Sequence, residues 1–421
     1  QAMTPLQLRP HQQRILDALQ TASKGCVYCP TGGGKTLAMI TDLQRRLDAS
    51  ERPLTVVVVA PRILLANQLC SEFLEHPGIR RPDLVPAHVH SGETKHFRTT
   101  KPDQIALFDK MCESMVAHRL IFTTYHSLHR IVDAGIDIDV SYFDEAHNAT
   151  QKSHFVGVAG TSLSSDNAYF FTATPRYSRK TNGRGMNNSL VFGNDLINVP
   201  APELMNNGSI IPPKVSSLEV DETRTKHNAH EVDRNNIIRI LDDLDGVGKV
   251  LVAAPSTRII WNMIARTDAI HQLRKRGYDV LHITSKHGAY VNQTKVGREE
   301  FFKTLTEWGK DPSRKFVLFH YSILSEGINV PGLTHTILLR QLPVIEMAQT
   351  IGRVIRLDRD DAEGIASGAI TPGKFEMYRK PCGNVIVPLH SKGAAATIKR
   401  LQAITDIIFE QGMPAIGYIN D

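Results

Sequence analysis

Short apolar segments rich in β-branched residues alternate with amphipathic segments along the first half of the chain. The clearest is TVVVVA at 55–60, a continuous apolar run that is typical of a parallel strand covered on both faces. Similar strands are predicted at 25–29, 118–124, 139–147 and 167–175, with helix-length segments between them. This order predicts an α/β fold whose parallel sheets are built from βαβ units.

The pattern stops between residues 176 and 213 and then begins again. The interruption is polar and glycine-rich, and it ends in the sequence NGSIIPPK, which marks a crossing between domains. Apolar strands then recur, and a closing helix follows them, at 248–257, 278–285, 315–322, 334–341, 384–390 and 392–411. We therefore predict two copies of one architecture, residues 1–205 and residues 206–421.

The sequence CPTGGGKT at 29–36 lies between a predicted strand and a predicted helix. Glycines at such a junction let consecutive backbone N–H groups turn toward phosphate oxygens at the positive N-terminus of a helix. Lys35 would reach the β- and γ-phosphates of ATP, and the Thr36 hydroxyl would bind Mg²⁺. Cys29 stands where the usual P-loop pattern begins with Gly, but the spacing from Gly34 onward is intact. The predicted cradle for the phosphates consists of Pro30, Thr31, Gly32, Gly33 and Gly34.

Two acidic residues follow an apolar strand in the sequence SYFDEAHN. Asp144 can bind Mg²⁺ through water, and Glu145 can orient and deprotonate an attacking water molecule. Such a pair alone is more often an exposed turn. Together with a P-loop it predicts nucleotide hydrolysis.

A cationic stripe is predicted in the second half, in the sequence VIEMAQTIGRVIR at 344–356. If the segment is a helix, Gln349, Arg353 and Arg356 share one face, and most of the remaining residues are apolar. A largely buried helix with such a stripe needs an anionic counterpart. We expect Arg353 and Arg356 to act on the triphosphate as arginine fingers, and a structural salt-bridge stripe is the alternative.

Several short motifs, taken in order, resemble those of helicase superfamily two over nearly the whole chain. They are LRPHQQ (8–13), APR (60–62), TTYHS (123–127), DEAH (144–147), TATP (172–175), APST (254–257), LSEGINVPG (324–332) and QTIGRVIR (349–356). The resemblance implies two RecA-like parallel-sheet domains in tandem with an ATP cleft between them. It also implies a nucleic-acid strand lying across both domains.

The resemblance further implies roles for individual residues. Arg9 and Gln12 would contact the adenine base, and Glu326 and Gly327 would face the nucleotide, with the ribose contact on Glu326. His147 and Gln349 would belong with the catalytic groups. The nucleic-acid strand would be contacted by Arg62, Thr124, Ser127 and Thr257, which are hydroxyl or cationic groups suited to phosphate.

Composition adds few constraints. The formal net charge is +6, which is compatible with a polyanionic partner but also with scattered surface charge. Five cysteines form no regular framework, and the pair Cys26 and Cys29 lacks a second pair, so we expect a reducing, cytoplasmic setting and no zinc site. No apolar run approaches the roughly 20 residues of a membrane span, and no membrane partner is expected.

The expected activity is that of an ATP-dependent helicase or translocase, most readily on single-stranded or branched DNA in repair or restriction. RNA is also possible. Two alternatives stay open: a motor that tracks along duplex as part of a larger system, and an ATP-gated clamp that does not separate strands. Selectivity is expected to come from loops or protein partners, and one copy of the chain should suffice for function because the arginine fingers are in cis.

Overall fold

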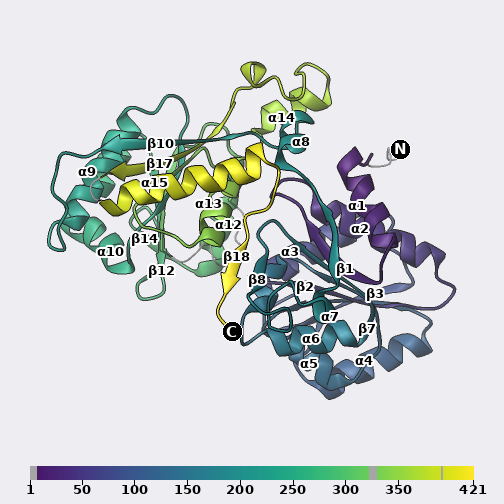
Figure 1. The fold of residues 1–421 in the computed structure, drawn as a ribbon. Helices are drawn as coiled ribbons and strands as arrows, with labels where there is room; N and C mark the ends of the chain where they lie inside the picture. Colours follow the sequence, from purple (N-terminus) through teal and green to yellow (C-terminus); the bar gives the residue numbers. More distant parts are fainter. Residues whose placement is uncertain (1–6, 322–329, 390–391) are drawn as a thin grey trace. The chain divides into compact units, whose positions relative to one another are not determined.

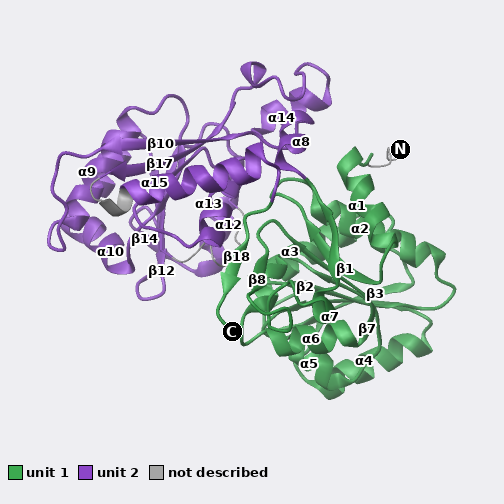
Figure 2. Cartoon of the chain, in the orientation of Figure 1, with its two compact units in different colours: residues 1–199, 414–421 green, residues 200–413 purple. Residues whose placement is uncertain are grey.

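The computed structural model describes residues 7–321, 330–389 and 392–421. It divides into two compact units (Figure 2), unit 1 with residues 1–199 and 414–421 and unit 2 with residues 200–413. The division falls after Val199 rather than after residue 205, and the last eight residues belong to unit 1. They do so because β18 (Gly417–Ile419) pairs in parallel with β8 (Arg176–Ser178).

Figure 1 labels β1, β2, β3 and β7 of the sheet in unit 1. This sheet has eight described strands in the order β4-β3-β5-β2-β6-β7-β1-β9, and every neighbouring pair is parallel. The strands are β1 (Lys24–Tyr28), β2 (Thr55–Ala60), β3 (Leu84–Val89), β4 (Phe97–Arg98), β5 (His118–Thr124), β6 (Ile138–Phe143), β7 (Ser165–Thr172) and β9 (Asn194–Asn198). All six residues of β2 are buried, as predicted for a strand covered on both faces.

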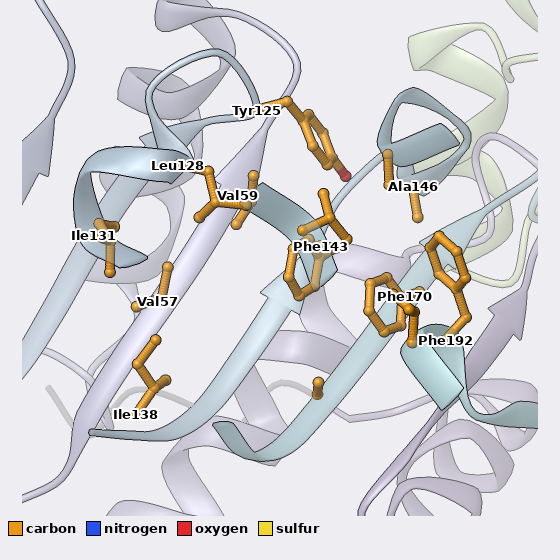
Figure 3. Close-up of a cluster of buried hydrophobic side chains, with 14 of the residues drawn as sticks. Val57, Val59, Tyr125, Leu128, Ile131, Ile138, Phe143, Ala146, Phe170 and Phe192 are labelled. Carbon is orange, nitrogen blue, oxygen red and sulfur yellow. The ribbon is translucent and has the colours of Figure 1, made fainter. Parts of the chain in front are cut away.

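Helices cover this sheet and complete its core. They are α1 (Pro10–Gln20), α2 (Lys35–Ala49), α3 (Ile63–Glu75), α4 (Pro102–Ser114), α5 (Leu128–Ala134), α6 (Phe155–Leu163), α7 (Ser189–Phe192) and the short 3-10 helix η1 (Ala146–Thr150). Figure 3 shows one buried cluster, in which Phe143 and Phe170 stack with ring centres 4.4 Å apart and Phe192 meets Phe170 edge-on. Such packing fixes the ends of β6 and β7, which carry the acidic turn and the TATP segment.

Unit 2 contains a second sheet, in the order β10-β17-β16-β11-β15-β12-β13-β14. Its strands are β10 (Pro213–Glu219), β11 (Lys249–Ala253), β12 (Asp279–Thr284), β13 (Gly288–Val291), β14 (Thr294–Val296), β15 (Phe316–His320), β16 (His335–Leu338) and β17 (Gly383–Leu389). The first six in spatial order are parallel, whereas β13 pairs antiparallel with both β12 and β14. The antiparallel hairpin therefore extends one edge of an otherwise parallel sheet.

The helices of unit 2 include the segment predicted to carry the cationic stripe. They are α8 (Ala201–Asn206), α9 (Ala229–Asp242), α10 (Thr257–Arg266), α11 (Ala269–Lys275), α12 (Arg298–Lys310), α13 (Val344–Val354), α14 (Arg359–Ala366), η3 (Phe375–Met377), α15 (Lys392–Thr405) and η4 (Asp406–Glu410). The predicted closing helix at 392–411 is thus confirmed as α15 continued by η4.

One part of the helix prediction was wrong. Helix α13 ends at Val354, so Arg356 does not share a helical face with Gln349 and Arg353. The backbone leaves the helix because the Ile355 carbonyl accepts a hydrogen bond from the Ile211 amide and Arg356 forms a bridge with Ile210. Strand-like pairing has replaced the last helical turn.

Candidate nucleotide site in unit 1

The glycine run forms a tight loop between β1 and α2, and Gly34 is the residue that caps the helix. Its φ of +76° lies in the left-handed region, and Gly32 has a φ of +89°. A Cβ added at Gly34 would lie 2.4 Å from Nε2 of Gln12. The backbone angle therefore favours glycine, and a side chain here would also displace the Gln12 amide. The first turn of α2 directs amide donors that have no intrahelical acceptor into this loop, as a phosphate cradle requires.

Helix α1 holds the loop through two side chains. Gln12 donates from Nε2 to the Gly34 carbonyl at 3.0 Å, and its Oε1 accepts from the Arg9 amide at 2.9 Å. The ring of His11 is buried, with Nε2 2.6 Å from the Gly33 carbonyl oxygen. Gln12, which was expected to contact the adenine base, thus fixes the loop, and Arg9 is exposed.

Lys35, at the start of α2, meets both acidic residues that follow β6. Its Nζ lies 2.7 Å from Oε1 of Glu145 and 3.8 Å from Oδ1 of Asp144. Burial lowers the Lys35 pKa, but the two carboxylates outweigh it and hold this pKa above its ordinary value. Burial raises the pKa of Asp144 to about 6, and Lys35 opposes that rise. The parallel strands β1, β6 and β7 bring these groups together, because their carboxyl ends lie at one edge of the sheet.

Glu145 has a strained backbone. Its φ of +48° and ψ of +53° lie in the left-handed region, which is uncommon for a residue with a side chain. The buried hydroxyl of Tyr125 donates to the Asp144 carbonyl at 2.7 Å, and Nδ2 of Asn148 donates to the Glu145 carbonyl at 2.9 Å. Figure 3 shows Tyr125 beside Val59 and Phe143 in the core. Sequence reasoning missed the role of Tyr125, although it lies within the quoted motif TTYHS.

His147 links the acidic turn to the segment TATP. Its Nδ1 lies 2.8 Å from Oγ1 of Thr172, 3.3 Å from Oγ1 of Thr174 and 3.7 Å from Oε2 of Glu145. Burial lowers its pKa to about 4, so the ring is neutral at pH 7. The amide of Asn148 faces Nε2 at 3.3 Å, and because an amide nitrogen only donates, this contact assigns the ring proton to Nδ1.

The structure supplies two of the groups expected to hold Mg²⁺. Thr36 lies in the first turn of α2, and the Oδ1 atom of Asp144 is buried with no hydrogen-bond partner among the described residues. A buried carboxylate oxygen without a hydrogen bond, and a hydroxyl in the first turn after a phosphate loop, are ligands that suit a hard cation. The residues present therefore fit the predicted metal.

The residues expected to contact nucleic acid lie at strand ends in both units, as predicted. Arg62 is exposed immediately before α3, and Thr257 is the half-buried first residue of α10. Thr124 and Ser127 are buried, and the Thr124 hydroxyl accepts from the Ser127 amide at 3.2 Å. The two residues therefore also shape the loop after β5.

Unit 2 carries the remaining predicted residues. Gln349 and Arg353 lie half-buried on α13, and Arg356 is half-buried just after its end. Glu326 and Gly327 lie outside the described residues.

Two family models match the chain, one in each unit. The model described as Type III restriction enzyme, res subunit, matches residues 5–177, and the Helicase conserved C-terminal domain model matches residues 234–358. The chain belongs to helicase superfamily two, whose members use ATP. No curated protein sequence matches it.

Solved structures share the fold. The ATP-dependent Type ISP restriction-modification enzyme LlaBIII bound to DNA has a TM-score of 0.69 and 14% identity, over 99% of this chain and 31% of that one. S. cerevisiae Dbp5 bound to RNA and ADP BeF3 has a TM-score of 0.57 and 13% identity, over 97% and 88%. The Mycobacterium smegmatis helicase Lhr bound to ssDNA and AMP-PNP has a TM-score of 0.54 and 17% identity, over 94% and 48%.

These similarities establish two tandem RecA-like domains. The chain spans less than a third of the length of LlaBIII, and 29% of the Type ISP enzyme LlaGI. Among the helices in the described part of the chain, none is long and apolar enough to cross a bilayer.

Proposed function

We propose that the chain is the motor of an ATP-dependent helicase or translocase that acts on DNA. The observation that carries the proposal is the continuous set of contacts from Lys35 through Glu145 and His147 to Thr172. It joins the group expected to hold phosphate to the group expected to orient water, and both to the TATP segment. A change at the phosphate would therefore be transmitted to the end of β7.

Each residue has a distinct chemical task in this proposal. The amides of the loop and Lys35 bind the triphosphate, and Glu145 orients the attacking water and accepts its proton. Bound through Thr36 and Asp144, Mg²⁺ would neutralise charge on the phosphates. The neutral ring of His147 lies 3.7 Å from the Glu145 carboxylate and 2.8 Å from the Thr172 hydroxyl, and so lies between the acidic turn and β7. The motif that contains Arg353 and Gln349 supports a second contribution to hydrolysis, from unit 2.

DNA is the preferred substrate. The match to a restriction-enzyme model and the higher TM-score of a DNA-bound Type ISP enzyme support DNA, whereas Dbp5, with a lower score, is bound to RNA. The same similarities favour a restriction-type system over DNA repair and support protein partners or further domains as the source of selectivity. The five cysteines, none in a disulfide, support a cytoplasmic setting.

The proposal is tested by ATP hydrolysis with and without polynucleotides. We expect single-stranded or branched DNA to stimulate hydrolysis more than RNA of equal length, and a strand-displacement assay then separates unwinding from tracking along duplex. Glu145→Gln should bind ATP and DNA but not hydrolyse ATP, because an amide cannot accept the proton. The proposal fails if no polynucleotide stimulates hydrolysis by the unmodified chain.

A further inference from the structure

A group of aromatic rings lies around the hairpin β13–β14, contributed by α10, β12, the turn after β12 and β13. Trp261 of α10 stacks on His287 with ring centres 4.0 Å apart and planes 6° from parallel, and it lies 5.9 Å from Tyr290. Tyr290 in turn stacks on His282 at 4.7 Å. We call Trp261, His282, His287 and Tyr290 the aromatic platform. Within the platform His282 is buried, whereas the other three rings are half-buried and so partly accessible to solvent.

The segment that contains the hairpin is also basic. Residues 280–298 contain no Asp or Glu, but they include Lys286, Lys295 and Arg298. Lys286 and Lys295 are exposed, and neither forms an ion pair with a carboxylate within the described residues. Lys295 is the cross-strand partner of Tyr290, which places a cation beside the platform.

The position of the platform suits a ligand. Strands β11 and β12 both run parallel to β15, so their carboxyl ends lie at the same edge of the sheet. Helix α10 begins after β11, and the turn with Lys286 and His287 follows β12. Open α/β sheets bind their ligands outside this edge. Thr257, already expected to contact nucleic acid, lies one helical turn before Trp261 on the same face of α10.

We propose that the aromatic platform binds the bases of a single strand of nucleic acid by stacking, with Lys286 and Lys295 on its phosphates. Stacking on aromatic rings requires unpaired bases and tolerates any sequence, and nearby lysines add charge attraction. The platform therefore distinguishes single strands from duplex, whereas contacts to phosphate alone do not. This inference rests on the proposed action on a nucleic-acid strand and adds a base-contacting site to it.

Fluorescence of Trp261 tests the stacking directly. The chain has two tryptophans, Trp261 and Trp308, so Trp308→Phe leaves Trp261 as the only indole. Phenylalanine keeps an aromatic ring under Arg314, which lies over Trp308. We expect an oligothymidylate of about 12 nucleotides to quench Trp261, and an abasic strand of equal length and charge to quench it far less. Equal quenching by the two strands, or none by either, would overturn the proposal.

Binding by variants tests the energetics. Trp261→Ala and Tyr290→Ala should each weaken single-strand binding about tenfold or more, and Lys286→Ala should reduce the salt slope by about 0.7. Lys275→Ala, on α11, is the matched control and should leave affinity unchanged. Circular dichroism identifies any variant that fails to fold. If a platform variant fails to fold, the fluorescence test on Trp308→Phe decides whether the platform binds bases. Folded Trp261→Ala that binds like the unmodified chain refutes the platform.

The fluorescence and binding measurements are made without ATP. Their outcome therefore does not depend on ATP hydrolysis, and the two proposals can fail separately. If ATP hydrolysis is stimulated by DNA while the platform variants bind normally, the platform is wrong and the motor function stands. If no polynucleotide binds or stimulates hydrolysis, both proposals fail.

Discussion

Replacing Tyr125 by phenylalanine removes one hydroxyl group from the core of unit 1 and leaves the ring in place. The lost donor is the one that bonds the Asp144 carbonyl at 2.7 Å. A buried acceptor left without its donor costs about 1–3 kcal/mol. For a unit of this size about 1 kcal/mol lowers the melting temperature by about 2–4 °C, so we expect a fall of roughly 2–12 °C.

The same change should slow hydrolysis. The strained backbone of Glu145 persists only while neighbouring contacts hold it, and Tyr125 fixes the carbonyl immediately before it. A catalytic group displaced by about 1 Å costs roughly 10²-fold in rate, so we expect kcat to fall about 10- to 100-fold. ATP affinity should stay within about twofold, because Lys35 and the glycine loop are untouched.

Two melting probes show which unit loses stability. Both tryptophans lie in unit 2, so indole fluorescence follows the melting of unit 2 while circular dichroism follows both units. Tyr142→Phe is the matched control, since it removes a buried hydroxyl that donates to Asp42 at 2.5 Å in the same unit. It should lower stability comparably but leave kcat unchanged. Equal losses of kcat in both variants would refute the positioning role of Tyr125, as would a normal kcat in Tyr125→Phe.

Three further predictions concern the site and unit 2. Lys35→Ala should abolish ATP hydrolysis and weaken binding of a non-hydrolysable ATP analogue in calorimetry, with an unchanged circular dichroism spectrum; residual hydrolysis above a tenth of normal contradicts it. Arg353→Ala should bind ATP normally but lower kcat by about 10³-fold, as loss of an arginine finger does, and near-normal turnover would exclude that role. Burial lowers the pKa of His282 to about 4 and of His320 to about 3, whereas an unfolded histidine titrates near 6.5. The unfolded chain therefore binds more protons below pH 6.5. As the pH falls from 6.5 toward 4, the free energy of unfolding of unit 2 should decrease by on the order of 5 kcal/mol. Fluorescence-detected melting measures this loss, His320→Phe should reduce it, and identical melting at pH 5 and pH 7.5 would be inconsistent with buried neutral rings.

The parallel strands were predictable because each is a short apolar run with a turn on either side. The first and last residues of β5 were predicted correctly, and so was the burial of β2 on both faces. The strand β3 was not predicted, because Pro86 interrupts it and proline is unfavourable inside a strand. The hairpin β13–β14 was not predicted either. Its two-residue turn uses Asn292 at a φ of +56° followed by Gln293, without the glycine that usually signals such turns.

The chemical groups of the site were easier to predict than the contacts that support them. Lys35, Asp144 and Glu145 are recognisable because each follows a strand at a spacing that chemistry constrains. The 2.7 Å contact between Lys35 and Glu145 confirms that the fold brings them together. The end of α13 was predicted less well, because helical periodicity continues to Arg356 while pairing with Ile210 ends the helix earlier.

Supporting contacts escaped prediction because they join residues far apart in sequence whose types are not specific. Gln12 reaches Gly34 across 22 residues, Tyr125 reaches Asp144 across 19, and His147 reaches Thr172 across 25. A glutamine, a tyrosine or a threonine at a strand end has many ordinary uses, so its type alone assigns no partner. In a parallel sheet the loops that follow adjacent strands meet at one edge, and each loop can hold the backbone of the next. Local spacing is therefore enough to predict which residues carry the chemistry, whereas the contacts that position them depend on the order of strands in the sheet.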